Sequence, residues 1–326
     1  PGHERVKQRL QIVVQAAKAR DDPLGHLLLS GPPGLGKTTL AYIIAHTRAK
    51  NIKATSAPVI EKPGDLAGLL NGLDSGDILF IDEIHRLPTA IEEYLYSAME
   101  DFVLDIMIDQ GAGARSVRLN LPHFTLIGAT TRQGTISAPL RSRFSLACRL
   151  DYYDVKDLEK ILKRSSGILG VEGDNEGIYE IARRSRGTPR IANNLLRWVR
   201  DYAQVKGKNK VVGAITRNAL ELLDIDESGL DEMDNRILET ILFKFGGGPV
   251  GLKTIAVAIG EEMTTIEDVY EPYLIQEGYL MRTAQGRIAT AKSGQRFGLQ
   301  DAGLKPVHQQ PNLFAGTDVE AEKDTP

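Results

Sequence analysis

The sequence predicts an α/β fold, a parallel sheet covered by helices, followed by a small helical domain and a C-terminal winged-helix domain. Three patterns predict this arrangement. Residues 1–151 alternate helical and apolar-strand patterns, residues 152–226 are helical by period, and residues 227–302 contain three helical stretches and then a short hairpin. A chain of 326 residues is long enough to give each of these domains its own core.

The composition excludes several classes of protein. The single cysteine, Cys148, excludes an internal disulfide framework and a cysteine zinc site, which fits a reducing compartment. No apolar run approaches the roughly 20 residues that span a bilayer, and the start of the chain does not resemble a signal peptide. We therefore expect a cytoplasmic protein with no membrane contact. Because the first residue is not methionine, we expect the natural N-terminus to lie upstream.

A complete G-x-x-x-x-G-K-T phosphate loop occupies residues 31–38. Its glycines, including Gly34, let the backbone approach the β- and γ-phosphates of a nucleotide, and the helix that follows offers free amides to the anion. Lys37 supplies a mobile positive charge. A strand expected over 26–30 and an amphipathic helix over 38–46 provide the strand-loop-helix context in which this motif binds phosphate.

A second apolar strand, expected over 77–81, leads into two adjacent carboxylates, Asp82 and Glu83. The Thr38 hydroxyl and Asp82 are hard oxygen donors of the kind that Mg²⁺ prefers, so they predict a metal site beside the phosphates. Glu83 is then positioned to polarise an attacking water. Together with the phosphate loop, this pair predicts hydrolysis of a nucleoside triphosphate, with ATP and Mg²⁺ as the expected ligands.

A β-hairpin is expected after these motifs. Two alternating apolar runs, 102–109 and 115–121, flank a glycine-containing turn, and further strands are expected over 52–55 and 124–129. The apolar side chains of the hairpin have no use in a plain nucleotide-binding domain. They therefore indicate a surface with another purpose.

The helical domain contains a break at Gly187-Thr-Pro-Arg190. Pro189 suits the first turn of a helix, where its missing N–H is not needed, and Thr188 is a plausible cap. This spacing puts Arg190 at the start of a helix, where it can face a phosphate. The many other basic residues around it are interpreted mainly as a solvated helix face.

In the last domain, helices are expected over 233–245 and 252–259 and from Thr265, followed by strands over 279–283 and 287–290. The neighbourhood of the third helix is acidic and would be repelled by phosphates, so insertion of that helix into the major groove is not expected. The wing, residues 281–298, is basic and has no acidic residue. It predicts sequence-independent contact with the backbone of duplex DNA, with protein contact as the alternative. The tail, residues 303–326, is expected to be disordered.

These residues closely resemble the RuvB family, the bacterial AAA+ motors that drive Holliday-junction branch migration. The resemblance runs from Pro1 to about Leu299, and its most specific parts are GPPGLGKTTLA, ILFIDEIHRL, PLRSRF, RGTPRIANNLLRWVRD and FGGGPVGLKTIAVAIGEE. It implies an AAA+ P-loop ATPase domain, a helical lid and a winged helix. It also implies a homo-hexameric ring that acts as an ATP-driven DNA helicase in recombination and repair, together with the junction-binding protein RuvA.

The resemblance assigns residues to the nucleotide. Gly34, Lys37, Thr38 and Thr39 resemble the phosphate and Mg²⁺ contacts, and Asp82 and Glu83 resemble the Walker B pair. Either Thr130 or Thr131 resembles sensor 1, and the sequence leaves this choice open. Arg143 resembles the arginine finger that enters the neighbouring subunit's site, and Arg190 resembles sensor 2.

Other roles follow from the same resemblance. Tyr153 corresponds to a residue that packs near the nucleotide, and Glu100, Asp101 and Phe102 correspond to a nucleotide-site segment. The hairpin over 102–121 corresponds to the element that docks on RuvA. The expected DNA contacts are Arg282 and Arg287, which match family arginines, and Lys292 of the basic wing.

Two alternative functions remain open. One is a clamp loader or another AAA+ protein-remodelling ATPase, which a protein would stimulate and duplex DNA would not. The other is a nucleotide-switched winged-helix regulator that recognises one DNA sequence and hydrolyses little nucleotide. Intact Glu83 and Arg143 argue against the regulator, and the hairpin and the acidic third helix favour the motor.

Overall fold

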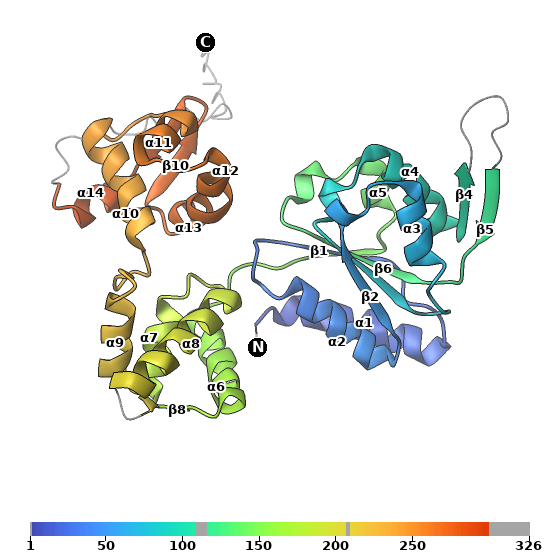
Figure 1. Cartoon of the computed structure of the whole chain (residues 1–326), viewed down its shortest axis with the longest axis horizontal. Coiled ribbons are helices and arrows are strands. Elements are labelled where there is room, and N and C mark those ends of the chain that lie inside the picture. The colour runs from blue at the N-terminus through green and yellow to red at the C-terminus, as the bar shows by residue number, and fades with distance from the viewer. Residues whose placement is uncertain (1, 108–115, 207–208, 300–326) are drawn as a thin grey trace, which may run out of the picture. The chain divides into compact units, whose positions relative to one another are not determined.

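The computed structural model describes residues 2–107, 116–206 and 209–299. The chain divides after Gly229 into two compact units. The first unit contains a parallel sheet with its helices and a helical lid, and the second contains the winged helix (Figure 1). Among the helices of the described residues, none combines the length and apolar character needed to span a bilayer.

The central sheet has five parallel strands in the order β2-β3-β6-β1-β7. Their bounds are β1 Leu27–Ser30, β2 Ile52–Ser56, β3 Ile78–Asp82, β6 Thr125–Thr130 and β7 Leu146–Arg149. Because all five run the same way, their carboxyl ends meet at one edge of the sheet, where α/β proteins bind ligands. The phosphate loop, Asp82 and Thr130 follow or end strands at this edge.

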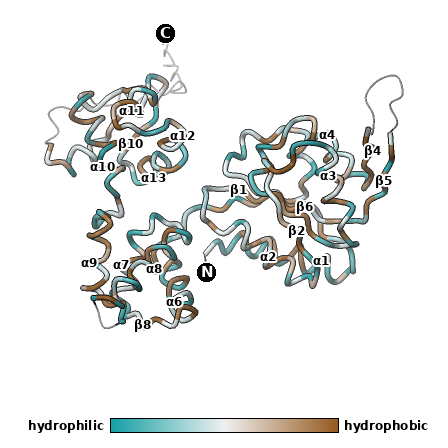
Figure 2. The backbone as a smooth tube through the Cα atoms, viewed as in Figure 1, coloured by the Kyte–Doolittle hydropathy of each residue, from teal (hydrophilic) through white to brown (hydrophobic). Residues whose placement is uncertain are grey.

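Helices cover both faces of this sheet. Helices α1 (Glu4–Arg20) and α2 (Lys37–Arg48) pack on the face that carries Leu27 and Leu29, whereas α3 (Pro63–Leu70) and α4 (Thr89–Glu100) pack on the face that carries Leu28. Neighbouring residues of one strand thus enter two different cores, as expected when a strand is buried on both sides. Figure 2 shows the hydrophobic residues concentrated along these central strands.

Short elements complete the large domain. They are the 3-10 helices η1 (Ala57–Val59), η2 (Ile84–Arg86) and η3 (Gln133–Thr135) and the helix α5 (Ala138–Ser142). Strand β7 was missing from the sequence prediction because its four residues, Leu-Ala-Cys-Arg, give no apolar run long enough to identify.

The predicted β-hairpin is confirmed for the described residues. Strands β4 (Val103–Met107) and β5 (Ser116–Asn120) pair antiparallel and form a separate two-stranded sheet. The turn expected between them lies outside the described residues. The pair stands beside the central sheet rather than within it (Figure 1). Leu104 is buried in the core below, while Val117 is exposed.

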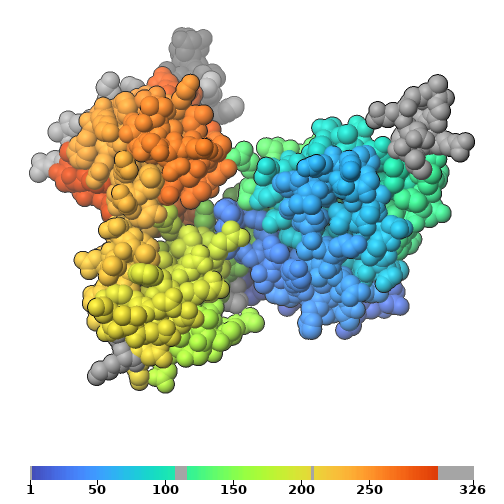
Figure 3. Space-filling view, in the orientation of Figure 1, coloured from blue at the N-terminus to red at the C-terminus, as the bar shows by residue number. Residues whose placement is uncertain are grey.

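The lid consists of α6 (Val155–Leu169), α7 (Asn175–Arg183), α8 (Pro189–Lys206) and α9 (Gly213–Glu221), with a short parallel ladder between β8 (Glu172–Gly173) and β9 (Lys210–Val211). Side chains of Asp154 and Asp174 cap α6 and α7 by accepting backbone N–H groups. One apolar cluster unites the helices, which form a continuous body coloured green to yellow in Figure 3. Helix α8 begins at Pro189, as predicted.

The second unit is built from α10 (Glu232–Glu239), α11 (Leu252–Ile259), α12 (Met263–Thr265), α13 (Glu271–Gln276), the antiparallel strands β10 (Leu280–Thr283) and β11 (Gly286–Ala289), and α14 (Ala291–Arg296). Two five-residue π-helical segments, η4 (Thr240–Lys244) and η5 (Ile266–Tyr270), extend α10 and join α12 to α13. One core cluster holds these elements together. The predicted tail lies outside the described residues.

Candidate active site

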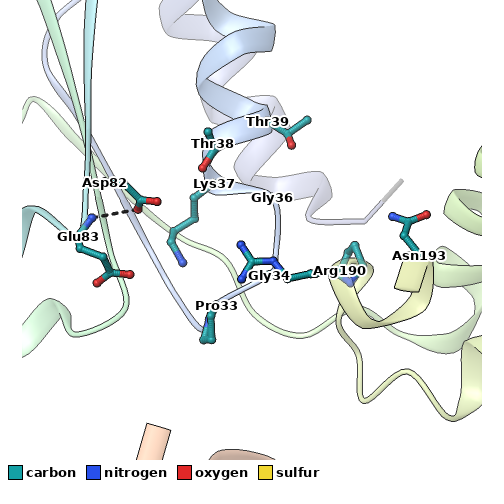
Figure 4. Close-up of a pocket in the computed structure, with 11 residues that line it drawn as sticks. Pro33, Gly34, Gly36, Lys37, Thr38, Thr39, Asp82, Glu83, Arg190 and Asn193 are labelled. Atoms are coloured by element: carbon teal, nitrogen blue, oxygen red, sulfur yellow. Dashed lines mark hydrogen bonds between the residues drawn. The ribbon is translucent and has the colours of Figure 1, made fainter. Parts of the chain in front are cut away.

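A cavity of about 380 Å³ lies where the phosphate loop, the end of β3 and the start of α8 meet (Figure 4). Its lining residues are Pro33, Gly34, Gly36, Lys37, Thr38, Thr39, Asp82, Glu83, Pro189, Arg190 and Asn193. The structure thus brings most of the predicted nucleotide residues together. Asn193 was not predicted, although it lies three residues after Arg190 and so shares its helix face.

The phosphate loop has the conformation that its glycines allow. Gly34 has a φ of +80°, and a Cβ atom there would lie 2.7 Å from the Thr188 Cγ2 and 3.0 Å from the Arg190 Cβ. Gly36, with a φ of +93°, precedes α2, and no side chain caps that helix. The first amides of α2 are therefore available to an anion, which the positive end of the helix dipole also favours.

Lys37 is held beneath the loop. Its Nζ donates hydrogen bonds to the carbonyls of Gly31, at 2.8 Å, and Pro32, at 2.9 Å. Burial lowers the pKa of Lys37, and the carboxylates of Glu83 and Asp82 oppose this shift. Because the lysine is bonded to the loop itself, a phosphate arriving in the cavity meets a charge that is already in position.

The two carboxylates have different surroundings. Asp82 ends β3, and its Oδ1 accepts the backbone N–H of Glu83 at 3.0 Å (Figure 4). Glu83 has a left-handed backbone, with a φ of +49°, and its Oε2 accepts the Thr131 hydroxyl at 3.1 Å. The same oxygen lies 3.2 Å from the Nδ1 of His85. This geometry directs Glu83 away from the strand and into the cavity.

The two threonines at the end of β6, Thr130 within the strand and Thr131 just after it, are distinguished by their contacts. Thr130 is fully buried, and its hydroxyl accepts the N–H of Arg132 and lies 3.0 Å from the Nδ1 of His85. Thr131 is the one whose hydroxyl contacts the Glu83 carboxylate. His85 therefore connects Thr130 to Glu83. Sequence reasoning missed this histidine, whose only signal was its place two residues after Glu83.

Arg190 reaches the site from the lid. The N–H of Arg190 donates to the Gly34 carbonyl at 3.3 Å, which ties the first turn of α8 to the phosphate loop. In Figure 4 its side chain faces Lys37 from the side opposite Asp82 and Glu83. Tyr153 is outside the cavity lining, but its hydroxyl donates to the Leu35 carbonyl at 3.3 Å.

Arg143 lies away from the cavity of its own chain. Its Nη2 forms an ion pair with Glu100 at 2.9 Å, its Nη1 donates to the Pro139 carbonyl, and its guanidinium covers the Tyr96 ring at 4.5 Å from the centroid. The side chain is 19% exposed. The expectation of a nucleotide-site segment at Glu100, Asp101 and Phe102 is not met within one chain, because these residues do not line the cavity.

The structure gives each predicted DNA contact an acidic neighbour. Arg282 pairs with Glu267 at 2.9 Å and is 56% exposed. Lys292 bonds to the Glu277 carbonyl, lies 3.8 Å from its carboxylate and covers the Tyr279 ring. These exposed pairs are easily exchanged for phosphate.

Arg287 differs from the other two. It is 8% exposed, and its Nε and Nη2 both donate to the carboxylate of Glu271, which is 2% exposed. That Arg287 contacts DNA stays a prediction, and in this structure the carboxylate of Glu271 already compensates its charge. Sequence reasoning treated the wing separately from the third helix, so it missed this pairing.

Comparison with known proteins identifies the family. Residues 1–150 match the Holliday junction DNA helicase RuvB P-loop domain, residues 153–226 match the RuvB AAA lid domain, and residues 227–298 match the RuvB C-terminal winged helix domain. The chain belongs to the RuvB family. Its predicted fold class, an AAA+ P-loop domain followed by a lid and a winged helix, is thereby confirmed.

Individual relatives support this membership in RuvB. The Holliday junction branch migration complex subunit RuvB of Chlorobium limicola is 56% identical over 95% of this chain and 89% of its own length. The protein of the same description from Chlorobium chlorochromatii is 58% identical over 91% and 84%. The solved structure of the Thermotoga maritima RuvB Holliday junction branch migration motor has a TM-score of 0.83 at 48% identity, covering 92% of this chain and 95% of that one.

Proposed function

We propose that this RuvB family member is the ATP-driven motor subunit that moves duplex DNA during branch migration of Holliday junctions, in recombination and repair. The observation that carries the proposal is the cavity where the lid's Arg190 meets Lys37 and the carboxylates of β3. A site built from two domains couples the presence of a γ-phosphate to the position of the lid. We also propose a cytoplasmic location, where bacteria such as the source of the first relative process their DNA.

The cavity suits hydrolysis of ATP. The γ-phosphate fits between Lys37 and Arg190, whose charges offset the negative charge that develops on the transferred group. Glu83 accepts a hydrogen bond from the attacking water and orients its oxygen toward phosphorus. As the new P–O bond forms, the water gives a proton to the Glu83 carboxylate and the bond from phosphorus to the β-γ bridging oxygen breaks, leaving ADP and inorganic phosphate. Thr131, through its contact with Glu83, is our choice for sensor 1.

The residues of the cavity also fit Mg²⁺. Thr38 and Asp82 both line the cavity and supply hard oxygen donors. Within the described part of the chain no group of three or more His, Cys, Asp or Glu side chains could hold a metal on its own. Such a sparse donor set suits Mg²⁺, which is bound by one or two protein oxygens together with substrate phosphates. When bound, the ion would neutralise charge on the β- and γ-phosphates.

Arg143 supports a shared site in a ring of identical subunits. Its side chain lies outside its own cavity and is paired with Glu100 near the protein surface. An arginine that served the nucleotide of its own chain would line the cavity, whereas one presented to a neighbour would serve as an arginine finger. We propose a homo-hexameric ring in which Arg143, with Glu100 and Asp101 beside it, faces the nucleotide of the adjacent subunit.

The remaining surfaces are assigned to partners. We propose that Arg282 and Lys292 contact the phosphates of duplex DNA independently of sequence, with Arg287 contributing at most through its Nη1. The β4–β5 hairpin, which stands beside the central sheet with Val117 exposed, is proposed as the docking element for RuvA. The names of the relatives describe a subunit of a branch migration complex, which supports junction DNA and a further subunit as partners.

The deciding experiment is an assay of ATP hydrolysis and strand displacement on a four-way DNA junction, with and without a RuvA partner. The proposal expects ATP-dependent movement of the junction that the partner stimulates. A Lys37→Ala variant is the matched negative control. Hydrolysis that responds to a protein but ignores DNA would favour a remodelling ATPase, and binding to one DNA sequence without turnover would favour a regulator.

A further inference from the structure

The loop between α7 and α8, residues 184–188, contacts three parts of the first unit. It lies between the nucleotide cavity, the connection from the sheet to the lid, and the segment that leads toward the winged helix. Its backbone is constrained, because Arg186 and Gly187 both have left-handed conformations, with φ values of +51° and +63°. Ser185 is fully buried, with its hydroxyl bonded to the Ile181 carbonyl.

The first contact is with the cavity. Thr188 and Arg190 lie against Gly34 of the phosphate loop so closely that only glycine fits there. The Arg190 N–H also bonds to the Gly34 carbonyl. A nucleotide that displaces the phosphate loop would therefore also displace the end of the 184–188 loop, at Thr188.

The second contact is with the start of the lid. The Tyr153 N–H donates to the Gly187 carbonyl at 2.8 Å. A Cβ atom on Gly187 would lie 2.6 Å from the Tyr152 Cβ. Because these tyrosines follow the large domain and precede α6, the loop is fixed to the segment about which the lid would turn.

The third contact is with residues 226–229, the last residues of the first unit. Arg183 Nη1 donates to the Glu227 carbonyl, and Arg186 Nε donates to the Gly229 carbonyl at 2.9 Å. Gly229 has a φ of +75°, and a Cβ atom there would lie 3.0 Å from the Arg184 carbonyl oxygen. Arg183, the last residue of α7, and Arg186 of the loop thus each hold one carbonyl of the linker.

The carboxylate of Glu180 pairs with two of the neighbouring arginines, Arg183 and Arg184. The Glu180 side chain is 9% exposed, and its Oε2 lies 2.7 Å from Arg183 Nη2 and 3.2 Å from Arg184 Nη2. Arg184 itself is 4% exposed. A charge that is paired in this way loses little freedom when it forms a further bond, so Arg183 holds the linker in a defined position.

We propose that Arg183 and Arg186 form a linker clamp that transmits the state of the nucleotide cavity to the winged helix. Arg186 is a positioning residue for mechanical coupling and takes no part in ATP hydrolysis. This inference rests on the proposed motor function. Without the clamp, the free φ and ψ angles of residues 226–229 would absorb a lid rotation, and hydrolysis would continue without moving DNA.

The test compares Arg186→Ala with the unmodified chain, each assembled with RuvA on a four-way junction. We measure ATP turnover and base pairs migrated, and we report their ratio. Arg197→Ala is the matched control, because Arg197 is an exposed arginine of the same lid that bonds only weakly, to Asn194 at 3.3 Å. We expect Arg186→Ala to keep wild-type turnover while the migration-to-turnover ratio falls about fivefold or more, the scale of a typical coupling free energy.

Two further variants protect the test against a folding defect. Arg186→Lys retains a donor that can reach the Gly229 carbonyl, so it should restore part of the ratio. Insertion of two glycines between Gly229 and Leu230 alters no lid residue and should lower the ratio as Arg186→Ala does. The inference is overturned if the insertion and Arg186→Ala keep the wild-type ratio, or if turnover falls in step with migration. Absence of migration by the unmodified protein would instead refute the proposed function.

Discussion

The nucleotide cavity and the wing of the second unit use positive charge in different ways. In the cavity, Lys37 is bonded to backbone carbonyls of its own loop, and Arg190 is exposed and faces it. In the wing, each predicted DNA contact has a carboxylate neighbour from the preceding helical region: Arg282 has Glu267, Arg287 has Glu271 and Lys292 has Glu277. The cavity is therefore prepared for an anion, whereas the wing must exchange partners to bind one.

A basic residue therefore contributes to binding, chemistry and folding in different proportions at the two sites. A cation held by carbonyls loses no ion pair when phosphate arrives, so its removal should affect binding or chemistry directly. A cation that is paired with a carboxylate contributes to folding in proportion to its burial and to DNA binding in proportion to its exposure. Substitutions at Arg143, Arg287, His26 and Arg282 test this distinction, with expected effects that decrease in that order.

The strongest test concerns Arg143, which is paired like a wing residue but assigned to the chemistry of a neighbouring cavity. We expect Arg143→Ala to bind ATP nearly normally and to lower turnover in the assembled ring by roughly a thousandfold or more, as for other arginine fingers. Steady-state hydrolysis and nucleotide affinity are the measurements. Arg141→Ala, at an exposed arginine two residues earlier, is the control. Wild-type turnover by Arg143→Ala would remove the trans role.

The second test concerns the buried pair of the wing. Arg287→Ala leaves the Glu271 carboxylate buried without its partner, so we expect the free energy of unfolding of the second unit to fall by about 3–5 kcal/mol. Denaturant unfolding followed in the full chain measures the loss. If the free energy of unfolding is unchanged and DNA affinity collapses, Arg287 acts like Lys37 as a cation available to an anion. The proposed difference between the cavity and the wing would then be wrong.

The third test extends the distinction to an uncharged ring in the core of the large domain. His26 Nδ1 accepts the Leu126 N–H, and its Nε2 lies 3.0 Å from the Met99 carbonyl, so the neutral ring is fully bonded. Burial lowers the pKa of His26 below the usual value of 6.5. The unfolded chain then binds the proton more readily, so stability rises with pH through the interval between the folded and unfolded pKa values and is lost as pH falls below about 6.5.

Thermal unfolding across that interval measures this contribution. His26→Gln should flatten the pH dependence, whereas His46→Gln, at an exposed histidine of α2, should leave it as in the unmodified protein. A pH profile that is identical in His26→Gln and the unmodified chain would contradict the assignment.

The smallest effect is expected for Arg282. Its pair with Glu267 is exposed, so Arg282→Ala should change stability by less than about 1 kcal/mol. If Arg282 contacts one phosphate, the variant should weaken binding to unrelated duplexes equally and reduce the slope of log affinity against log salt by about 1. Titrations at several salt concentrations with two unrelated duplexes measure both quantities. A loss confined to one sequence would exclude a backbone contact.

The sequence predicted local features well. The phosphate loop, the strand before Asp82 and the start of α8 at Pro189 depend on short-range rules for turns, helix starts and apolar runs, and the structure has all three. Strand β7 was missed because its four residues gain their conformation by pairing with β1, which is far away in the sequence. Its existence is decided by the tertiary structure rather than by local propensity.

The candidate site follows the same rule. The motif residues that the sequence assigned to the phosphates do line one cavity. Asn193 and His85 were missed because their roles depend on neighbours from other elements. The wing was read as a basic surface because its carboxylate partners lie 15 or 16 residues earlier, in the third helical region and just after it. Because these carboxylates lie outside the wing, the sequence of the wing alone does not reveal that its basic residues are paired.

The ion pair between Arg143 and Glu100 has a thermodynamic consequence for oligomerisation. In a solitary protomer both Nη groups of this arginine are bonded within the chain, so association with an empty neighbour offers them no better partner. A neighbour that has bound ATP does offer a better partner, the γ-phosphate. The contact between Arg143 and that phosphate can form only when the two protomers are associated, so it stabilises the assembled state alone. By mass action, ATP should therefore raise the affinity of protomers for one another, and subunit exchange should slow as the nucleotide concentration increases.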